Sequence, residues 1–258
     1  MLLSIIIVNF QSQDFLTKCL ESLEKQLKNL SFEVILVNND PTPLKKDFFA
    51  PFSFPHTLLE TNENLGFGAG CNLANQKALG EFLFFLNPDS FLTDDSLKKA
   101  LDFLQEKPSV GVVGGKIFLF PEKIIQPWTS GKKTSLWRIL FRHNFGASWK
   151  SQKPVSVDWV SGTALLTRKK LFEEIGGFDK DFFMYFEDQD LCLRIKNSGF
   201  KIFFLPFFSV NHYNGKSWDD NQQKKRIFYH SQDIFFQKHH PRWEKTLLKF
   251  FRFILKGR

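Results

Sequence analysis

The feature that most restricts the fold is an alternation of short apolar runs with amphipathic segments in the first hundred residues. Residues 3–8 form a continuous β-branched run, which predicts a strand buried on both faces. A helical pattern begins near Ser12 or Asp14, and further strand-like runs cover 33–37, 57–60 and 81–86. Strands that alternate with helices build a parallel sheet covered on both faces, so we predict an α/β fold with a mixed, mainly parallel sheet.

The second half of the chain repeats these signals less regularly. Asp94 or Asp95 should cap a helix that runs through Leu104. We expect a strand pair over 110–120 broken by Gly114-Gly115, a strand over 158–167 interrupted by Ser161-Gly162, a strand over 201–210 interrupted by Pro206, and a loop over 212–218.

Charge and cysteine content restrict the class of protein. The net charge is +8, yet residues 216–258 carry +7 and residues 121–153 carry +6, which leaves −5 for the remainder. Two basic segments on an acidic body predict a docking surface for something anionic. The three scattered cysteines suit a reducing compartment, and we see neither a signal peptide nor an apolar run of the ~18 residues that span a bilayer. We therefore expect a cytoplasmic protein.

Three carboxylates follow the aromatic run Phe182–Phe186: Glu187, Asp188 and Asp190. Apolar surroundings and a like charge nearby both raise the pKa of a carboxyl group, and such a group can act as a general base. The residues beyond them have helical spacing, with Gly199 as a stop. The alternative is structural: acids at a helix N-terminus, with Asp190 pairing with Arg194 one turn later.

Three polar loops follow predicted strands and should meet at one edge of the sheet, where open α/β sheets bind ligands. They are Asn38-Asn39-Asp40, the glycine-rich stretch 62–72, and Asn87-Pro88-Asp89. Asp89 suits Mg²⁺ or Mn²⁺ bound against a diphosphate, although a turn with a helix cap explains it equally well. The glycine-rich stretch matches neither GxGxxG nor a P-loop. His212 is a metal or phosphate ligand in one interpretation and a structural histidine in the other.

The ordered segments SIIIVNF, VILVNND, NENLGFGAGCN, FLNPDS, DWVSGTALL, GGFDKDFFMYFEDQDLCLRI and HYNGKS resemble family 2 glycosyltransferases, in particular their bacterial rhamnosyltransferase-like branch. The resemblance runs from about residue 3 to about residue 218. It implies a GT-A fold with a Rossmann-like sheet, a nucleotide-sugar donor, a divalent metal and inversion at the anomeric carbon. No QxxRW element is present, which argues against a processive polymer synthase.

The resemblance assigns roles to individual residues. It implies Asp188 as the general base with Glu187 as second choice, and Asp89, with His212, at the metal. It places Asn9, Asn38, Asn39, Asn64, Gly66, Asn72, Asn87 and Asp89 around the nucleotide sugar, and Trp159, Ser161, Gly162 and Thr163 on the acceptor side. The chain departs from the pattern of that family at two positions: Asn38 and Asn87 stand where many of its members carry aspartate.

The resemblance also divides the chain. Residues 1–215 would form the transferase domain, with a nucleotide-sugar half at 1–105 and an acceptor half at 106–215, and 216–258 would form a helical extension. In that extension, Lys245, Lys249, Arg252 and Lys256 form one stripe, while Trp243, Leu247, Phe250, Phe251 and Ile254 lie elsewhere around the helix. A basic amphipathic helix can lie in a membrane interface at the inner face of the cytoplasmic membrane, or pack on the domain with a solvated basic face.

The resemblance favours transfer of rhamnose from dTDP-rhamnose to a glycan or lipid-linked acceptor in cell-surface polysaccharide synthesis. A UDP-hexose or UDP-N-acetylhexosamine donor and a non-catalytic nucleotide-sugar-binding subunit stay open as alternatives. No recognised nucleic-acid-binding module is visible, so a nucleic-acid partner is not expected. A glycoside hydrolase would need two carboxylates flanking a bond and would leave the glycine-rich stretch unexplained.

Overall fold

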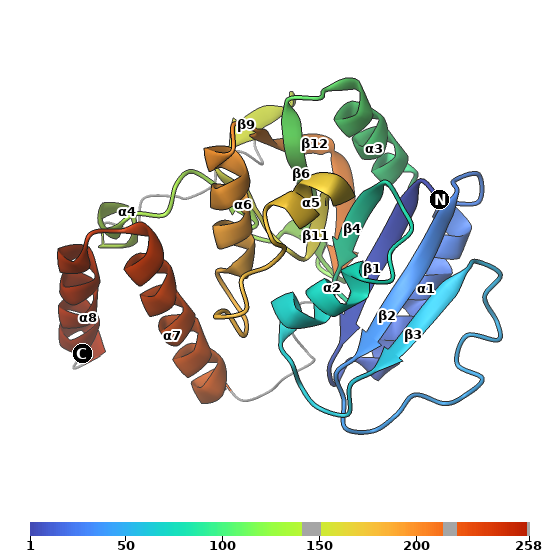
Figure 1. The fold of residues 1–258 in the computed structure, drawn as a ribbon, viewed down its shortest axis with the longest axis horizontal. Coiled ribbons are helices and arrows are strands. Elements are labelled where there is room, and N and C mark those ends of the chain that lie inside the picture. Colours follow the sequence, from blue (N-terminus) through green and yellow to red (C-terminus); the bar gives the residue numbers. More distant parts are fainter. Residues whose placement is uncertain (141–150, 214–220, 257–258) are drawn as a thin grey trace.

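The computed structural model describes residues 1–140, 151–213 and 221–256 and shows one large mixed sheet with helices around it (Figure 1). The sheet order is β3-β2-β1-β4-β11-β6-β12-β5, with β7 paired to β6 and β9 to β12, and β8 and β10 form a separate pair. The strands are β1 (Leu3–Asn9), β2 (Phe32–Asn38), β3 (His56–Glu60), β4 (Phe82–Leu86), β5 (Ser90–Phe91), β6 (Val110–Leu119), β7 (Ile124–Ile125), β8 (Ser130–Gly131), β9 (Val155–Val157), β10 (Trp159–Val160), β11 (Ala164–Arg168) and β12 (Lys201–His212).

Helices cover both faces of this sheet, as predicted. Side chains of α1 and α3 pack with one set of alternating strand residues, and those of α2, α5 and α6 pack with the other set. The described helices are α1 (Gln13–Gln26), α2 (Phe67–Asn75), α3 (Ser96–Glu106), α4 (Leu136–Leu140), α5 (Lys169–Glu174), α6 (Glu187–Asn197), α7 (Asn221–His239) and α8 (Arg242–Lys256). Strands β1 and β2 are buried along their whole length, which explains their unbroken apolar sequences.

The direction of the strands places the predicted loops at one edge. Strands β3, β2, β1 and β4 are all parallel, so their carboxyl ends lie together. Strand β11 runs antiparallel between β4 and β6. Its amino end therefore lies beside the carboxyl end of β4, and the loop before it joins the same edge.

The predicted break at Gly114-Gly115 is wrong, because β6 continues through both glycines. A Cβ atom on Gly115 would lie 2.2 Å from the carbonyl oxygen of Phe208, and one on Gly114 would lie 2.7 Å from Cβ of Val160. The glycines thus allow β6 to pack closely on β12 of the same sheet and on β10 of the small sheet. The irregularity falls on the neighbouring strand instead, where the register of β12 shifts between Leu205 and Ser209, around Pro206.

Two other boundaries differ from the prediction. The interruption predicted at Ser161-Gly162 is confirmed, but the two pieces belong to different sheets: β10 pairs with β8 in the small sheet, and β11 belongs to the central sheet. The loop expected from residue 212 begins one residue later, because His212 pairs with Ser90 as the last residue of β12. Residues 214–220 of that loop, including most of the HYNGKS segment, lie outside the described residues.

The C-terminal helices add a third apolar core. It joins Phe182 and Phe186, which precede α6, to Leu136 of α4, Phe235 and Phe236 of α7, and Leu248 of α8. Figure 1 shows α7 between α6 and α8, with α8 at the end of the molecule far from β3. Within the parts of the chain that the structure describes, no helix has the length and apolar character needed to cross a bilayer.

This third core predicts a contrast between two phenylalanines on adjacent helices. Phe236 is fully buried, whereas Phe253 is 80 % exposed. We expect Phe236→Ala to lower the free energy of unfolding by about 3 kcal/mol or more, because it leaves a cavity, and Phe253→Ala to change it by less than about 0.5 kcal/mol. Urea unfolding of both variants measures the difference. Equal effects would contradict the placement of α7 in the core.

Candidate functional site

The three carboxylates begin α6 directly after a strained turn. Tyr185 and Phe186 have φ angles of 69° and 67°, a left-handed conformation that is costly for residues other than glycine. The turn ends at Glu187, the first residue of the helix. The chain therefore changes direction sharply at the point where the two candidate catalytic carboxylates are presented.

Aromatic side chains of α7 hold this turn in place. The ring of Phe228 lies 5.7 Å from that of Tyr185 and 5.3 Å from that of Phe186, and the ring of Phe235 lies 5.4 Å from that of Phe186. The Ser231 hydroxyl donates to the carbonyl oxygen of Met184 at 2.7 Å. The strain of the turn is thus supported by side chains of α7 that lie more than forty residues further along the chain.

The environments of Glu187 and Asp188 differ. Glu187 is buried, and its Oε2 atom has no hydrogen-bond partner among the described residues. Burial raises the pKa of Glu187 well above its usual range, and the Asp188 carboxylate raises it further. Asp188 is half-buried and accepts from the backbone N–H of Gln189 at 2.7 Å and of Gly162 at 3.0 Å. Burial raises the pKa of Asp188 as well, although these bonds act in the opposite direction.

Asp190 has the structural role that the sequence left open. Its carboxylate is buried and pairs with Arg194 at 2.6 Å and with His239 of α7 at 2.7 Å. Arg194 also donates to the carbonyl oxygen of Ile175. Asp190 therefore ties α6 to α7, which leaves Asp188 as the more accessible acid of the three.

The loop between β10 and β11 connects the two predicted halves of the site. Gly162 N–H donates to Asp188, and one residue later the carbonyl oxygen of Thr163 accepts from the Asn87 N–H at 3.0 Å. Asn87 in turn begins the Asn-Pro-Asp loop after β4. The candidate base and the candidate metal loop therefore contact adjacent residues of one short segment and lie at the same edge of the sheet.

Asp89 and His212 meet, although they are far apart in sequence. Oδ1 of Asp89 lies 3.1 Å from Nε2 of His212, and both side chains are buried. Nδ1 of His212 lies 2.8 Å from Oε1 of Gln126, an acceptor, which assigns the ring proton of a neutral imidazole to Nδ1. The lone pair of Nε2 then faces the carboxylate, an arrangement that a cation would stabilise. No pattern in the sequence indicated Gln126 as a partner of His212.

The pair is small for a metal site. Within the described ranges, no group of three His, Cys, Asp or Glu side chains could hold an ion.

Aromatic residues support the backbone beside this pair. The Tyr213 N–H donates to the carbonyl oxygen of Asp89, and the Tyr213 hydroxyl accepts from Lys18. Nζ of Lys18 lies 4.3 Å from the ring centroids of both Phe91 and Phe120. The aromatic rings thus hold the backbone beside Asp89 and His212, and the sequence alone did not indicate this support.

Asn9 and Asn38, two asparagines predicted near the nucleoside, are buried at the carboxyl ends of β1 and β2. Asn38 is fully buried, donates to Glu60 at 2.7 Å and accepts from Asn9 at 2.7 Å. Asn9 also donates to Asp40, whose carboxylate accepts the N–H of Gln11. No pattern in the sequence indicated that the carboxylates of Glu60 and Asp40 would accept from the amides of Asn38 and Asn9. The structure gives Asn9 and Asn38 a structural role, and their contact with a nucleoside stays a prediction.

The residues of the glycine-rich stretch hold the loop that carries the carboxylates. Asn72 exchanges two hydrogen bonds with the backbone of Phe178, at 2.7 and 2.9 Å. Gly66 packs so closely on Phe183 that a Cβ atom would lie 2.3 Å from the Phe183 carbonyl oxygen. The side chain of Asn39 donates to the carbonyl oxygen of Gly66, and the side chain of Asn64 accepts from the Gly66 N–H. The predicted nucleotide loop and the predicted catalytic loop are therefore in direct contact.

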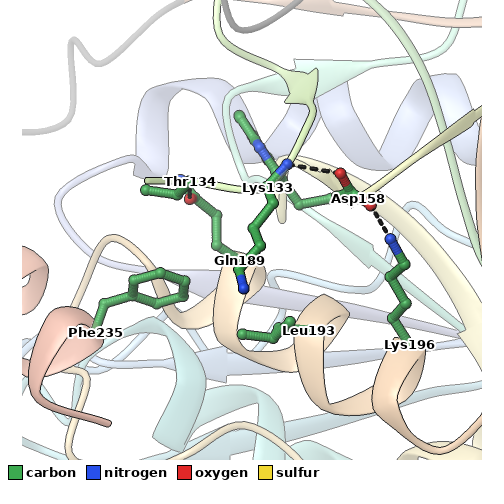
Figure 2. Close-up of a pocket in the computed structure, with 8 residues that line it drawn as sticks. Lys133, Thr134, Asp158, Gln189, Leu193, Lys196 and Phe235 are labelled. Atoms are coloured by element: carbon green, nitrogen blue, oxygen red, sulfur yellow. Dashed lines mark hydrogen bonds and ion pairs between the residues drawn. The ribbon is translucent and has the colours of Figure 1, made fainter. Parts of the chain in front are cut away.

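The four residues predicted on the acceptor side separate into two places. Ser161, Gly162 and Thr163 lie beside Asp188, and the Ser161 hydroxyl donates to that of Thr163. Trp159 instead lines a hollow on the outer side of α6, together with Gln189, Leu193, Phe235 and other residues. Figure 2 shows this hollow, with Asp158 joined to both Lys133 and Lys196.

Comparison with known proteins identifies the family. The model described as "Glycosyl transferase family 2" matches residues 4–176. The chain belongs to glycosyl transferase family 2. A second model, described as the N-terminal domain of galactosyltransferase, matches residues 143–216. Family 2 membership agrees with the resemblance seen in the sequence and with the arrangement of loops at the sheet edge.

Individual relatives of this family 2 chain are rhamnosyltransferases. It is 27 % identical to rhamnosyltransferase WbbL of Escherichia coli over 225 residues, which cover 81 % of this chain and 82 % of WbbL. It is 28 % identical over 272 residues, 91 % of this chain and 85 % of the relative, to the N-acetylglucosaminyl-diphospho-decaprenol L-rhamnosyltransferase of Mycobacterium tuberculosis.

A solved structure confirms the GT-A fold of this family 2 protein. GalNAc-T7 with UDP, GalNAc and Mn²⁺ superposes with a TM-score of 0.68 at 15 % identity, over 91 % of this chain and 50 % of that one. At this identity the likeness concerns the fold alone.

The contact between Gly66 and the catalytic loop is testable with a matched pair of glycines. Gly66 and Gly176 have φ angles of 84° and 83°, but a Cβ atom on Gly176 would meet nothing within 4 Å. Both Gly→Ala variants should lose about 1 kcal/mol or more to the left-handed conformation. We expect Gly66→Ala to lose about 1–3 kcal/mol beyond Gly176→Ala, because the Phe183 carbonyl must move. Urea unfolding measures both, and equal losses would contradict the contact.

Proposed function

We propose that this protein is an inverting glycosyltransferase that uses Asp188 as its general base. The observation that carries the proposal is the segment 161–163, which contacts Asp188 on one side and the loop of Asp89 on the other. A base and a diphosphate-binding loop at one sheet edge are what a single displacement on a nucleotide sugar requires. Family membership supports the reaction class.

The chemistry follows from the two carboxylates. Asp188 accepts the proton of an acceptor hydroxyl, the hydroxyl oxygen forms a bond to the anomeric carbon, and the bond from that carbon to the diphosphate breaks. The hydroxyl attacks from the face opposite the diphosphate, so the configuration inverts, and the nucleoside diphosphate leaves with the bonding electron pair. Asp188 is half-buried and burial raises its pKa, which suits a base, whereas Glu187 is buried and its pKa is raised further by the neighbouring Asp188 carboxylate.

Asp89 and His212 fit a divalent cation, because Nε2 of His212 is buried, has no hydrogen-bond partner among the described residues, and lies 3.1 Å from Oδ1 of Asp89. We propose that these two residues hold Mg²⁺ or Mn²⁺, with the remaining ligands supplied by the donor diphosphate and water. When bound, the cation would neutralise charge that develops on the departing diphosphate. Gln126 orients the imidazole for this role.

We propose a dTDP-rhamnose donor and a lipid-linked saccharide acceptor. Two relatives that match more than four-fifths of this chain are named rhamnosyltransferases, and one of them by its name acts on an N-acetylglucosaminyl-diphospho-decaprenol. A UDP-sugar donor is the second candidate. Thermal-shift measurements with dTDP-rhamnose, UDP-glucose and UDP-N-acetylglucosamine, each with and without Mn²⁺, distinguish the donors. The expected reaction takes place in the cytoplasm.

Removal of the base should separate catalysis from binding. We expect Asp188→Asn to lower kcat by about 10²–10⁴-fold, because the amide cannot accept the hydroxyl proton, while the Kd for the donor stays within a factor of about two to three. Radiolabelled sugar transfer measures kcat, and calorimetry measures donor binding. The exposed acid Glu174 supplies the control, since Glu174→Gln should leave both unchanged. Full activity of the Asp188→Asn variant would show that Asp188 is not the base and would leave Glu187 as the candidate.

Removal of the metal ligands should show a different pattern. We expect Asp89→Asn and His212→Ala each to weaken Mn²⁺-dependent donor binding by about 10-fold or more, with little change in the small affinity measured in EDTA. Isothermal titration with the nucleoside diphosphate, in Mn²⁺ and in EDTA, checks this. Gln126→Ala should have a weaker effect in the same direction. Donor binding that is equally strong in EDTA for the unmodified protein would contradict the metal site.

A further inference from the structure

The outer face of α8 is a large apolar surface. Trp243, Phe250 and Ile254 recur at spacings of seven and four, so they lie on one side of the helix. They are 51 %, 56 % and 44 % exposed, and the adjacent Phe253 is 80 % exposed. Trp137 of α4, a helix that contacts α8, is 56 % exposed. Exposed aromatic side chains gathered in this way mark an interaction site.

The basic stripe of α8 faces the protein instead. Arg252 pairs with Asp233 of α7 and lies over the ring of Tyr229, and Lys249 lies 3.6 Å from the same aspartate. Lys245 donates to Gln237 of α7 at 2.6 Å. The side chain of Lys256 lies outside the described residues. The sequence predicted that the stripe would meet either solvent or lipid, but its three described members bind α7, and Trp243, Phe250 and Ile254 are exposed instead.

The surrounding charge decides between partners. Residues 221–256 carry nine Lys or Arg against two Asp or Glu, a net charge of +7. A second copy of the chain on this face would bring two such surfaces together, and their repulsion opposes a dimer. An anionic lipid surface complements the charge, and tryptophan rings are favoured at the depth of the headgroups.

We propose that the outer face of α8, with Trp137, inserts into the interface of an anionic bilayer. The helix would lie in the plane of the membrane. Its aromatic side chains would reach the boundary between headgroups and acyl chains, and the flanking cations would lie near the headgroups. The surface involves none of the residues assigned to donor binding, metal or base. Its test therefore does not depend on the proposed reaction.

The experiment uses vesicles of phosphatidylcholine and phosphatidylglycerol in equal parts, with vesicles of phosphatidylcholine alone for comparison. We expect the full chain to co-sediment with the first and much less with the second. The variant Trp243→Ser/Phe250→Ser/Phe253→Ser should lower the partition coefficient at least about tenfold, which corresponds to about 1.4 kcal/mol. Three exposed apolar residues elsewhere supply the control: Leu79→Ser/Ile124→Ser/Phe207→Ser should bind like the unmodified chain.

Several outcomes would overturn the proposal. The first is no binding to the anionic vesicles at low salt, and the second is equal binding by both triple variants. The third is that light scattering shows a dimer that the α8 variant dissociates, which would assign the face to a second copy. Circular dichroism of each variant checks its fold, and because all six changed side chains are exposed, we expect it to match the unmodified protein.

Discussion

The site depends on the packing of α7 against the left-handed turn at Tyr185 and Phe186. Two consecutive residues other than glycine in this conformation cost free energy of order 1–3 kcal/mol each, so the turn persists only where its surroundings stabilise it. Phe228, Phe235 and Ser231 provide those surroundings, and the Asp190–His239 pair fixes the first turn of α6. The position of Asp188 is therefore set by a helix that the family resemblance does not cover.

The sheet supplies the second constraint, since it brings distant loops to one edge. The parallel strands β1, β2 and β4 place the asparagine and Asn-Pro-Asp loops together, and antiparallel β11 brings in the segment 161–163 from the second half of the chain. Gly162 of that segment donates to Asp188, and Thr163 accepts from the Asn87 N–H, so both loops contact this one segment. The proposed donor half and catalytic half therefore meet at this segment, and they also meet where Gly66 and Asn72 contact the backbone of Phe183 and Phe178.

The sequence predicted those parts of the fold that depend on local pattern. The buried strands, the helix boundaries near Ser12 and Gly199, and the meeting of loops at the sheet edge follow from periodicity and strand direction, and they are confirmed. The prediction from sequence failed where a contact between residues far apart in the chain determines the local structure. Gly114 and Gly115 look like a break, but tertiary packing requires them inside a strand. Gln126, Glu60 and Lys18 carry no motif, so their roles beside His212, Asn38 and Tyr213 became visible only in three dimensions.

The dependence of the turn on α7 has a consequence for evolution in this family. The matched family region ends at Gly176, before the candidate base at Asp188 and its aromatic support. A tail exchanged with that of a relative would have to bring side chains shaped for the rings of Tyr185 and Phe186. The C-terminal helices and the turn at Tyr185 and Phe186 are thus expected to covary. A chimaera of two family members joined near residue 216 should be active only if the aromatic residues of its C-terminal helices fit the turn of its N-terminal part.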